Sequence, residues 1–119
     1  MQRYVLIRMF VLDVMADDYE NLEMIYGELH KFGERCGLTL RASEILAALI
    51  QLIELGLAKA YWLWQPPVRE IEGVPPLDEI DRYYFWLTEE GRKVQLADYE
   101  NWPFDTEGAV RRDWVCPVS

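Results

Sequence analysis

The sequence contains few of the residues that bind metals or form disulfides. Two cysteines, Cys36 and Cys116, lie far apart in the chain, and His30 is the only histidine. A zinc site built on these three side chains would still need a fourth ligand. A chain this rich in apolar residues needs no disulfide scaffold, so we expect reduced cysteines and a cytoplasmic location. We predict no metal and no cofactor.

The sequence also lacks the motifs of common enzyme classes. It has neither a glycine-rich phosphate loop after a strand nor the Gly-x-Ser-x-Gly turn that carries a nucleophilic serine. Carboxylates gather at Asp13, Asp17, Asp18 and Glu20, but they fall at a helix boundary, where caps and solvated faces are ordinary. Cys36 has no accompanying base to activate it. We therefore expect a non-enzymatic protein and assign no catalytic residue.

Positive charge is scarce, and no long uncharged apolar run is present. Lys and Arg number 12 against 21 Asp and Glu, which gives a net charge of -9. Such a field repels phosphate backbones and anionic lipid surfaces and favours basic partners. The apolar stretch at residues 4–15 is short for a membrane span and contains Arg8 and Asp13. It predicts a buried helix, and we expect a soluble chain that does not bind membranes.

The sequence does contain enough apolar material for one folded domain, since 51% of its 119 residues are hydrophobic. Apolar residues at helical spacing alternate with β-prone runs, which predicts an α+β fold. A second helix is expected to be capped by Asp17 and Glu20 and to stop at Gly33. The other expected helices cover residues 4–15, 41–55 and 88–99, and a two-stranded hairpin covers residues 57–64 and 82–88. We place the domain at residues 1–99 and an irregular tail at residues 100–119, packed on the domain or on a partner.

Three segments carry a resemblance to a known family. They read YGEL at residues 26–29, LIELGL at residues 52–57 and RYYFWLTEEGR at residues 82–92. Over residues 3–98 the chain resembles winged-helix regulators of the PadR-like kind. The resemblance implies a three-helix bundle with a helix-turn-helix, a two-stranded β-hairpin wing and a C-terminal helix. The proline-rich connection between the two strands would be an exposed wing loop.

The resemblance also implies a DNA-contacting surface on the third helix and the wing. The side chains implied to face DNA are Arg41, Ser43, Glu44, Ala47, Ala48 and Gln51 on the helix, with Arg69 and Arg82 in the wing.

The charges on this surface argue against tight DNA binding. Residues 42–56 contain no Lys or Arg, whereas Glu44 and Glu54 are acidic. In the wing, Arg69 and Arg82 are outnumbered by five acidic residues between positions 65 and 82. A surface that contacts phosphate needs more basic than acidic residues. The sequence therefore predicts weak DNA binding without sequence preference.

Two apolar surfaces are candidates for binding another protein. Strand alternation sends Tyr61, Leu63, Tyr84 and Trp86 to the same side as Lys59, away from the core. Either the tail covers them with its aromatic residues, or they form a partner-binding patch. The first helix is apolar nearly all round, so we also expect one of its faces, represented by Val11, to pair two copies into a homodimer.

The sequence thus supports two hypotheses of different class. The first is a non-enzymatic winged-helix interaction or regulatory module that binds another, unidentified protein. The second is a DNA-binding transcriptional regulator of the PadR-like type that acts as a dimer. The acidic third helix and wing favour the first hypothesis.

Overall fold

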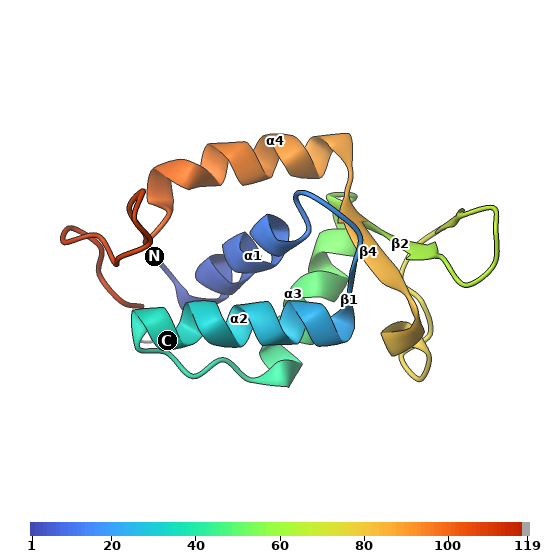
Figure 1. Cartoon of the computed structure of the whole chain (residues 1–119), viewed down its shortest axis with the longest axis horizontal. Helices are drawn as coiled ribbons and strands as arrows, with labels where there is room; N and C mark the ends of the chain where they lie inside the picture. The colour runs from blue at the N-terminus through green and yellow to red at the C-terminus, as the bar shows by residue number, and fades with distance from the viewer. Residues whose placement is uncertain (118–119) are drawn as a thin grey trace.

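The fold is α+β, with a helical body and a small sheet at one end of it (Figure 1). The computed structural model describes residues 1–117, and within them it contains four α-helices and four short strands. The helices cover α1 Arg3–Val14, α2 Leu22–Cys36, α3 Ala42–Glu54 and α4 Glu89–Asp98, and the strands cover β1 Glu20–Asn21, β2 Ala58–Trp62, β3 Arg69–Ile71 and β4 Tyr84–Leu87.

Helix α1 lies at the centre of the helical body, between α2 and α4 (Figure 1). It packs against α2, α3 and α4, and six of its residues are buried. Val11 is fully buried, so the prediction that it lies on an open dimer face is wrong. The reason is that α4 covers the face that three helices alone would leave open. Within residues 1–117, no helix has both the length and the apolar content needed to cross a bilayer.

The start and end of α2 differ from the sequence prediction. Asn21 caps the helix by accepting a hydrogen bond from the backbone N–H of Met24 at 2.9 Å, whereas Asp17 and Glu20 were expected to do so. The helix ends at Gly37, which has a positive φ of 75°, and not at Gly33. Gly33 lies inside the helix, packed closely against the Leu38 carbonyl.

The sheet has two strands more than the hairpin that the sequence predicts. All pairings are antiparallel, in the order β1-β4-β2-β3. Strand β3 and a 3-10 turn at Ile80–Arg82 lie in the proline-rich connection, which was expected to be mostly exposed loop. The inner side of β2 and β4 is fully or nearly fully buried in the helical core, through Ala58, Ala60, Phe85 and Leu87.

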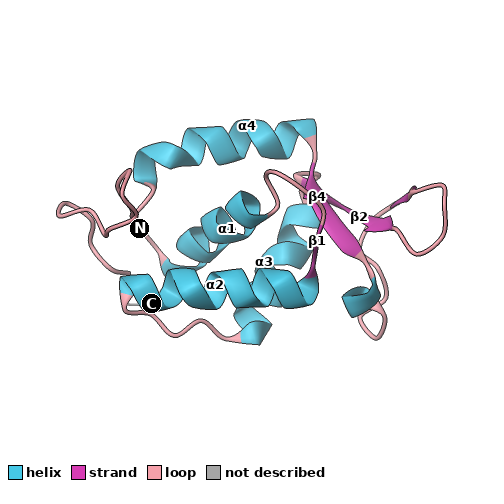
Figure 2. Cartoon of the chain, viewed as in Figure 1, coloured by secondary structure: helices cyan, strands magenta, loops and turns pink. Residues whose placement is uncertain are grey.

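The tail packs at the end of the helical body that lies away from the sheet (Figure 2). After a 3-10 turn at Tyr99–Asn101 it is irregular, and the rings of Trp102 and Phe104 contact Phe10 and Phe32. The idea that its aromatic residues cover the hairpin is therefore wrong for these two rings. Residues 118–119 of the predicted tail lie outside the described residues.

The buried face of α3 leads to a prediction about stability. Leu49 and Leu87 are buried in the core, whereas Leu55, at the end of α3, is 56% exposed. We expect Leu49→Ala and Leu87→Ala each to lower the free energy of unfolding by about 2 to 5 kcal/mol, because each leaves a cavity. Leu55→Ala is the control and should cost less than about 1 kcal/mol. Equal losses at the three positions in urea unfolding would contradict this assignment of faces.

Candidate interaction surface

Four of the six side chains expected to face DNA on and beside α3 are exposed, and those of Glu44 and Ala48 are half-buried. Arg41, Ser43, Ala47 and Gln51 are all exposed. Arg41 immediately precedes α3, and its backbone N–H donates to the Glu44 carboxylate at 3.1 Å. The exposed side chains on and beside α3 thus include one guanidinium, that of Arg41, and the polar groups of Ser43 and Gln51.

The acidic residue at the start of α3 is neutralised by a residue that sequence reasoning overlooked. The Arg3 guanidinium donates from Nε to Glu44 Oε2 at 2.8 Å and from Nη2 to Oε1 at 3.0 Å. These bonds, together with the backbone N–H of Arg41, lower the pKa of Glu44 to about 2. Glu44 thus stays ionised but paired, and the beginning of α3 is less repulsive to anions than its sequence indicates.

The wing does not provide a matching basic surface. Arg69 and Arg82 are exposed on separate elements, β3 and the 3-10 turn. The Lys59 ammonium lies 2.7 Å from the Glu70 carboxylate and 3.8 Å from that of Glu72, and these contacts raise the pKa of Lys59. Lys59 is consequently already engaged within the chain.

The outer side of the sheet carries four packed aromatic side chains, which we call the aromatic face: Tyr19, Tyr61, Tyr84 and Trp86. Tyr61 lies opposite Tyr84 in the β2–β4 register, as the alternation of the two strands predicts. The ring of Tyr19 packs edge-on against Tyr61 and Trp86, with centroids 5.1 and 4.6 Å apart. Sequence reasoning missed Tyr19, because the strand that follows it has only two residues and no periodicity.

The aromatic face remains half-buried rather than covered. Tyr19 packs against Tyr61 and Trp86, and Tyr84 lies beside Trp64, while the helical core packs against the inner side of the sheet. Figure 2 shows the strands at one end of the molecule and the loops of the tail at the other. Leu63, which the sequence places on the same side, follows the end of β2 and is also half-buried.

The aromatic side chains continue beyond the sheet into a shallow hollow of about 330 Å³ lined by Trp62, Trp64 and Arg82. Trp64 is 61% exposed, and its indole N–H donates to the Arg82 carbonyl at 2.7 Å. Its ring lies 6.3 Å from that of Tyr84. Aromatic side chains with one polar end are common in protein interfaces.

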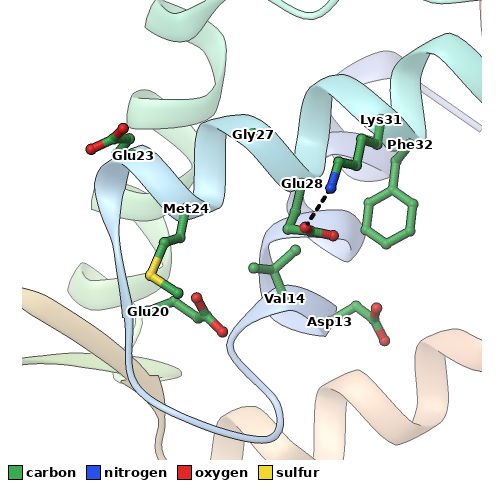
Figure 3. A pocket seen from close by; sticks show the side chains of 9 residues that line it. All are labelled: Asp13, Val14, Glu20, Glu23, Met24, Gly27, Glu28, Lys31 and Phe32. Carbon is green, nitrogen blue, oxygen red and sulfur yellow. Dashed lines mark hydrogen bonds and ion pairs between the residues drawn. The ribbon is translucent and has the colours of Figure 1, made fainter.

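A second hollow, of about 510 Å³, lies between α1, β1 and α2 and is acidic (Figure 3). Asp13, Glu20, Glu23 and Glu28 line it, and its one cation, Lys31, contacts Glu28 at 3.2 Å. Glu23 and Asp13 lie at opposite ends of it in Figure 3. Among residues 1–117, no group of three His, Cys, Asp or Glu side chains could hold a metal ion. This hollow repels anionic ligands.

Two half-buried titratable groups, on α1 and at the end of α2, have raised pKa values. Burial raises the pKa of Asp13, whose carboxylate accepts a hydrogen bond from the Tyr99 hydroxyl at 3.0 Å. Burial likewise raises the pKa of the Cys36 thiol to about 11, so the reactive thiolate is disfavoured.

In comparisons with known proteins, no family model matches this chain, and neither a curated protein nor a solved structure matches it.

Proposed function

We propose that this chain is a non-enzymatic winged-helix module that binds another protein through the aromatic face. One observation carries the proposal: four aromatic side chains lie half-buried on the outer side of the sheet, while the helices and the rings of Trp102 and Phe104 pack elsewhere. Aromatic side chains that keep part of their surface accessible to solvent are enriched in protein interfaces.

The order of elements supports the winged-helix part of the proposal. Strand β1 lies between α1 and α2 and pairs with β4, the second strand of the hairpin that follows α3. In a winged helix, three helices are followed by a hairpin, and this hairpin also pairs with the strand after the first helix. The order of elements in this chain is compatible with that arrangement.

The charge of the chain restricts the chemistry of the partner. The net charge is -9, and the acidic hollow between α1 and α2 adds a local negative field. We infer a partner with apolar side chains at the centre of its contact and basic groups around them, because complementary charge speeds association and excludes acidic competitors.

A DNA-binding regulator of the PadR-like type, acting as a dimer, is the second candidate function. The ion pair between Arg3 and Glu44 favours it, because it removes one repulsive charge from the beginning of α3. The acidic wing and the engaged Lys59 disfavour it.

The proposal predicts that the aromatic face is required for partner capture. The double substitution Tyr84→Ala with Trp86→Ala removes its central rings, and we expect at least about a tenfold loss of captured partner. Affinity capture from cells that express the tagged chain measures this. Leu96→Ala is the control, because Leu96 is 57% exposed on α4. A partner that binds both variants equally would contradict the proposal, provided that both have wild-type circular dichroism.

Titration of fluorescent DNA duplexes tests the second candidate. We expect weak binding with no sequence preference at physiological salt. Sub-micromolar affinity for one duplex, lost on Arg41→Ala and falling steeply with salt, would favour the regulator over the interaction module.

A further inference from the structure

The acidic hollow between α1, β1 and α2 contains apolar surface as well as carboxylates. Its apolar side chains are Val14 of α1 and Met24 and Phe32 of α2, and Figure 3 shows Val14 between the other two. Met24 is 46% exposed. Gly27 lies in the middle of the same face of α2, and a Cβ added to it would meet nothing within 4 Å. The hollow, of about 510 Å³, is therefore an open groove with room for side chains of a partner.

The carboxylates of this groove are not balanced by cations. Burial, and after it the negative charges of Asp18 and Glu28, raise the pKa of Glu20. Within residues 1–117, no basic group lies within 4 Å of the carboxylates of Asp13, Glu20 or Glu23. These three carboxylates are thus free to pair with a cation from outside the chain.

Among the residues that line the groove, Lys31 is the one cation, and it is held only by an exposed ion pair. Its ammonium lies 3.2 Å from the Glu28 carboxylate, and the two side chains are 72% and 48% exposed. Ion pairs as exposed as this one contribute little free energy. A cation that enters the groove can therefore displace Lys31 from Glu28 at little cost.

A buried hydrogen-bond acceptor without a partner lies beside the Asp13 end of the groove. The Tyr99 hydroxyl, which donates to Asp13, accepts a hydrogen bond from Gln95 Nε2 at 2.8 Å. Gln95 is only 3% exposed, and its Oε1 has no hydrogen-bond partner among residues 1–117. Buried acceptors normally have a donor. An ammonium or guanidinium group that binds Asp13 brings the N–H donors that this region lacks.

We propose that this groove binds an amphipathic basic segment of a partner protein, with its apolar side chains on Val14, Met24 and Phe32 and its lysines or arginines against the carboxylates. Charge complementarity selects this occupant, because the groove is lined by four carboxylates and one ammonium in a chain of net charge -9. A neutral or acidic segment would cover the carboxylates and leave them without a counter-charge, which is costly.

The groove is separate from the aromatic face. It is lined by α1, β1 and α2, and none of the four aromatic side chains of that face lines it. Tyr84→Ala with Trp86→Ala, which tests the proposed function, should therefore bind a basic segment as the wild type does. Failure of the groove to bind would leave the aromatic face as a partner site, and the reverse also holds.

Fluorescence anisotropy of the full chain with labelled synthetic peptides tests the proposal. The probe is a peptide of leucine and lysine, with the leucines at helical spacing. One control peptide has serine in place of leucine, and the other has glutamate in place of lysine. We expect the leucine–lysine peptide to bind at least about tenfold more tightly than either control. Equal binding of the serine–lysine peptide would overturn the proposal, because the net charge alone would then explain the attraction.

Filling the groove without changing its charge is the steric test. Gly27→Phe places a ring in the middle of the α2 face that lines the groove, and we expect at least about a tenfold loss of peptide binding. Gly27→Ala is the matched control and should bind as the wild type does, because a Cβ alone meets nothing there. A Gly27→Phe variant with wild-type circular dichroism and undiminished binding would overturn the proposal.

Removing charge from the groove is the electrostatic test. Glu20→Gln with Glu28→Gln keeps the shape of the groove, and we expect it to weaken peptide binding at least about tenfold. Glu79→Gln with Glu107→Gln removes the same charge at exposed positions outside the groove and should have a much smaller effect. If the two double variants lost affinity equally, the peptide would be responding to the overall charge of the chain, and the groove would not be its site.

Discussion

Replacing Gly91 with alanine is expected to lower the free energy of unfolding by about 3 kcal/mol or more, because the added methyl group meets backbone. Gly91 lies in the first turn of α4, and a Cβ there would fall 1.9 Å from the Leu57 carbonyl oxygen. That carbonyl also accepts the Thr88 N–H at 3.1 Å, and the Thr88 hydroxyl accepts the N–H of Gly91 at 3.0 Å. The two segments are bonded together and cannot separate easily.

Gly27→Ala is the matched control for this substitution. Gly27 also lies in a helix, α2, but a Cβ there would meet nothing within 4 Å. Alanine favours the helix, so we expect a gain of about 0.5 to 1 kcal/mol. Chemical denaturation of both variants measures the difference. If Gly91→Ala lost less than about 1 kcal/mol, the close contact between α4 and the start of β2 would be contradicted.

The longer elements could be predicted closely from the sequence, because local chemistry determines them. Helix α3 covers Ala42–Glu54. The apolar periodicity and the stop at Gly56 predicted a helix over residues 41–55, which differs by one residue at each end. Helix α4 begins after Thr88, whose hydroxyl caps it, as the glutamates that follow indicated. The shared side of Tyr61, Tyr84 and Trp86 follows from the two-residue period of a strand.

The short strands could not be predicted in the same way. Strand β1 has two residues and β3 has three, which is too few for any periodic pattern. They form strands because the backbone N–H and C=O groups of β4 and β2 pair with them. Their strand conformation therefore depends on parts of the chain outside the short segments themselves. Tyr19 joins the aromatic face for the same reason.

The ion pair between Arg3 and Glu44 shows a similar limit at the candidate site. The two residues are 41 positions apart and meet only when α1 packs along α3. Counting charges along α3 alone therefore overstated its repulsion for phosphate. The wing needed no such correction, because its acidic residues either remain exposed or hold Lys59.

The prediction that α1 has an open face was wrong because α4 and the tail, which come later in the chain, pack against this helix. An apolar helix can be buried by its own chain when later segments return to it, and the aromatic residues of a tail do not reveal where they pack. Here α4 packs against α1, and Trp102 and Phe104 cover its Phe10.

Phe10 is accordingly the residue where the tail, α1 and α2 meet, and Phe10→Ala is expected to cost about 3 to 5 kcal/mol. Its ring is fully buried, stacked 4.8 Å from Phe32 and set edge-on 5.5 Å from Trp102. The loss combines a cavity with the aromatic pairs. Urea unfolding measures it, and Leu96→Ala, at an exposed position of α4, should change stability by less than about 0.5 kcal/mol.

The same variant should release the tail, which trypsin can detect under native conditions. Arg111 donates to the Trp102 carbonyl at 3.0 Å, a bond within the tail itself, and Arg112 beside it is exposed. Without the Phe10 ring, Trp102 and Phe104 lose their buried contact, so cleavage after these arginines should be faster than in wild type or Leu96→Ala. Unchanged cleavage together with a large loss of stability would mean that the tail's contacts with Phe32 and Arg35 hold it without Phe10. A loss below about 1.5 kcal/mol would contradict the packing of the four rings altogether.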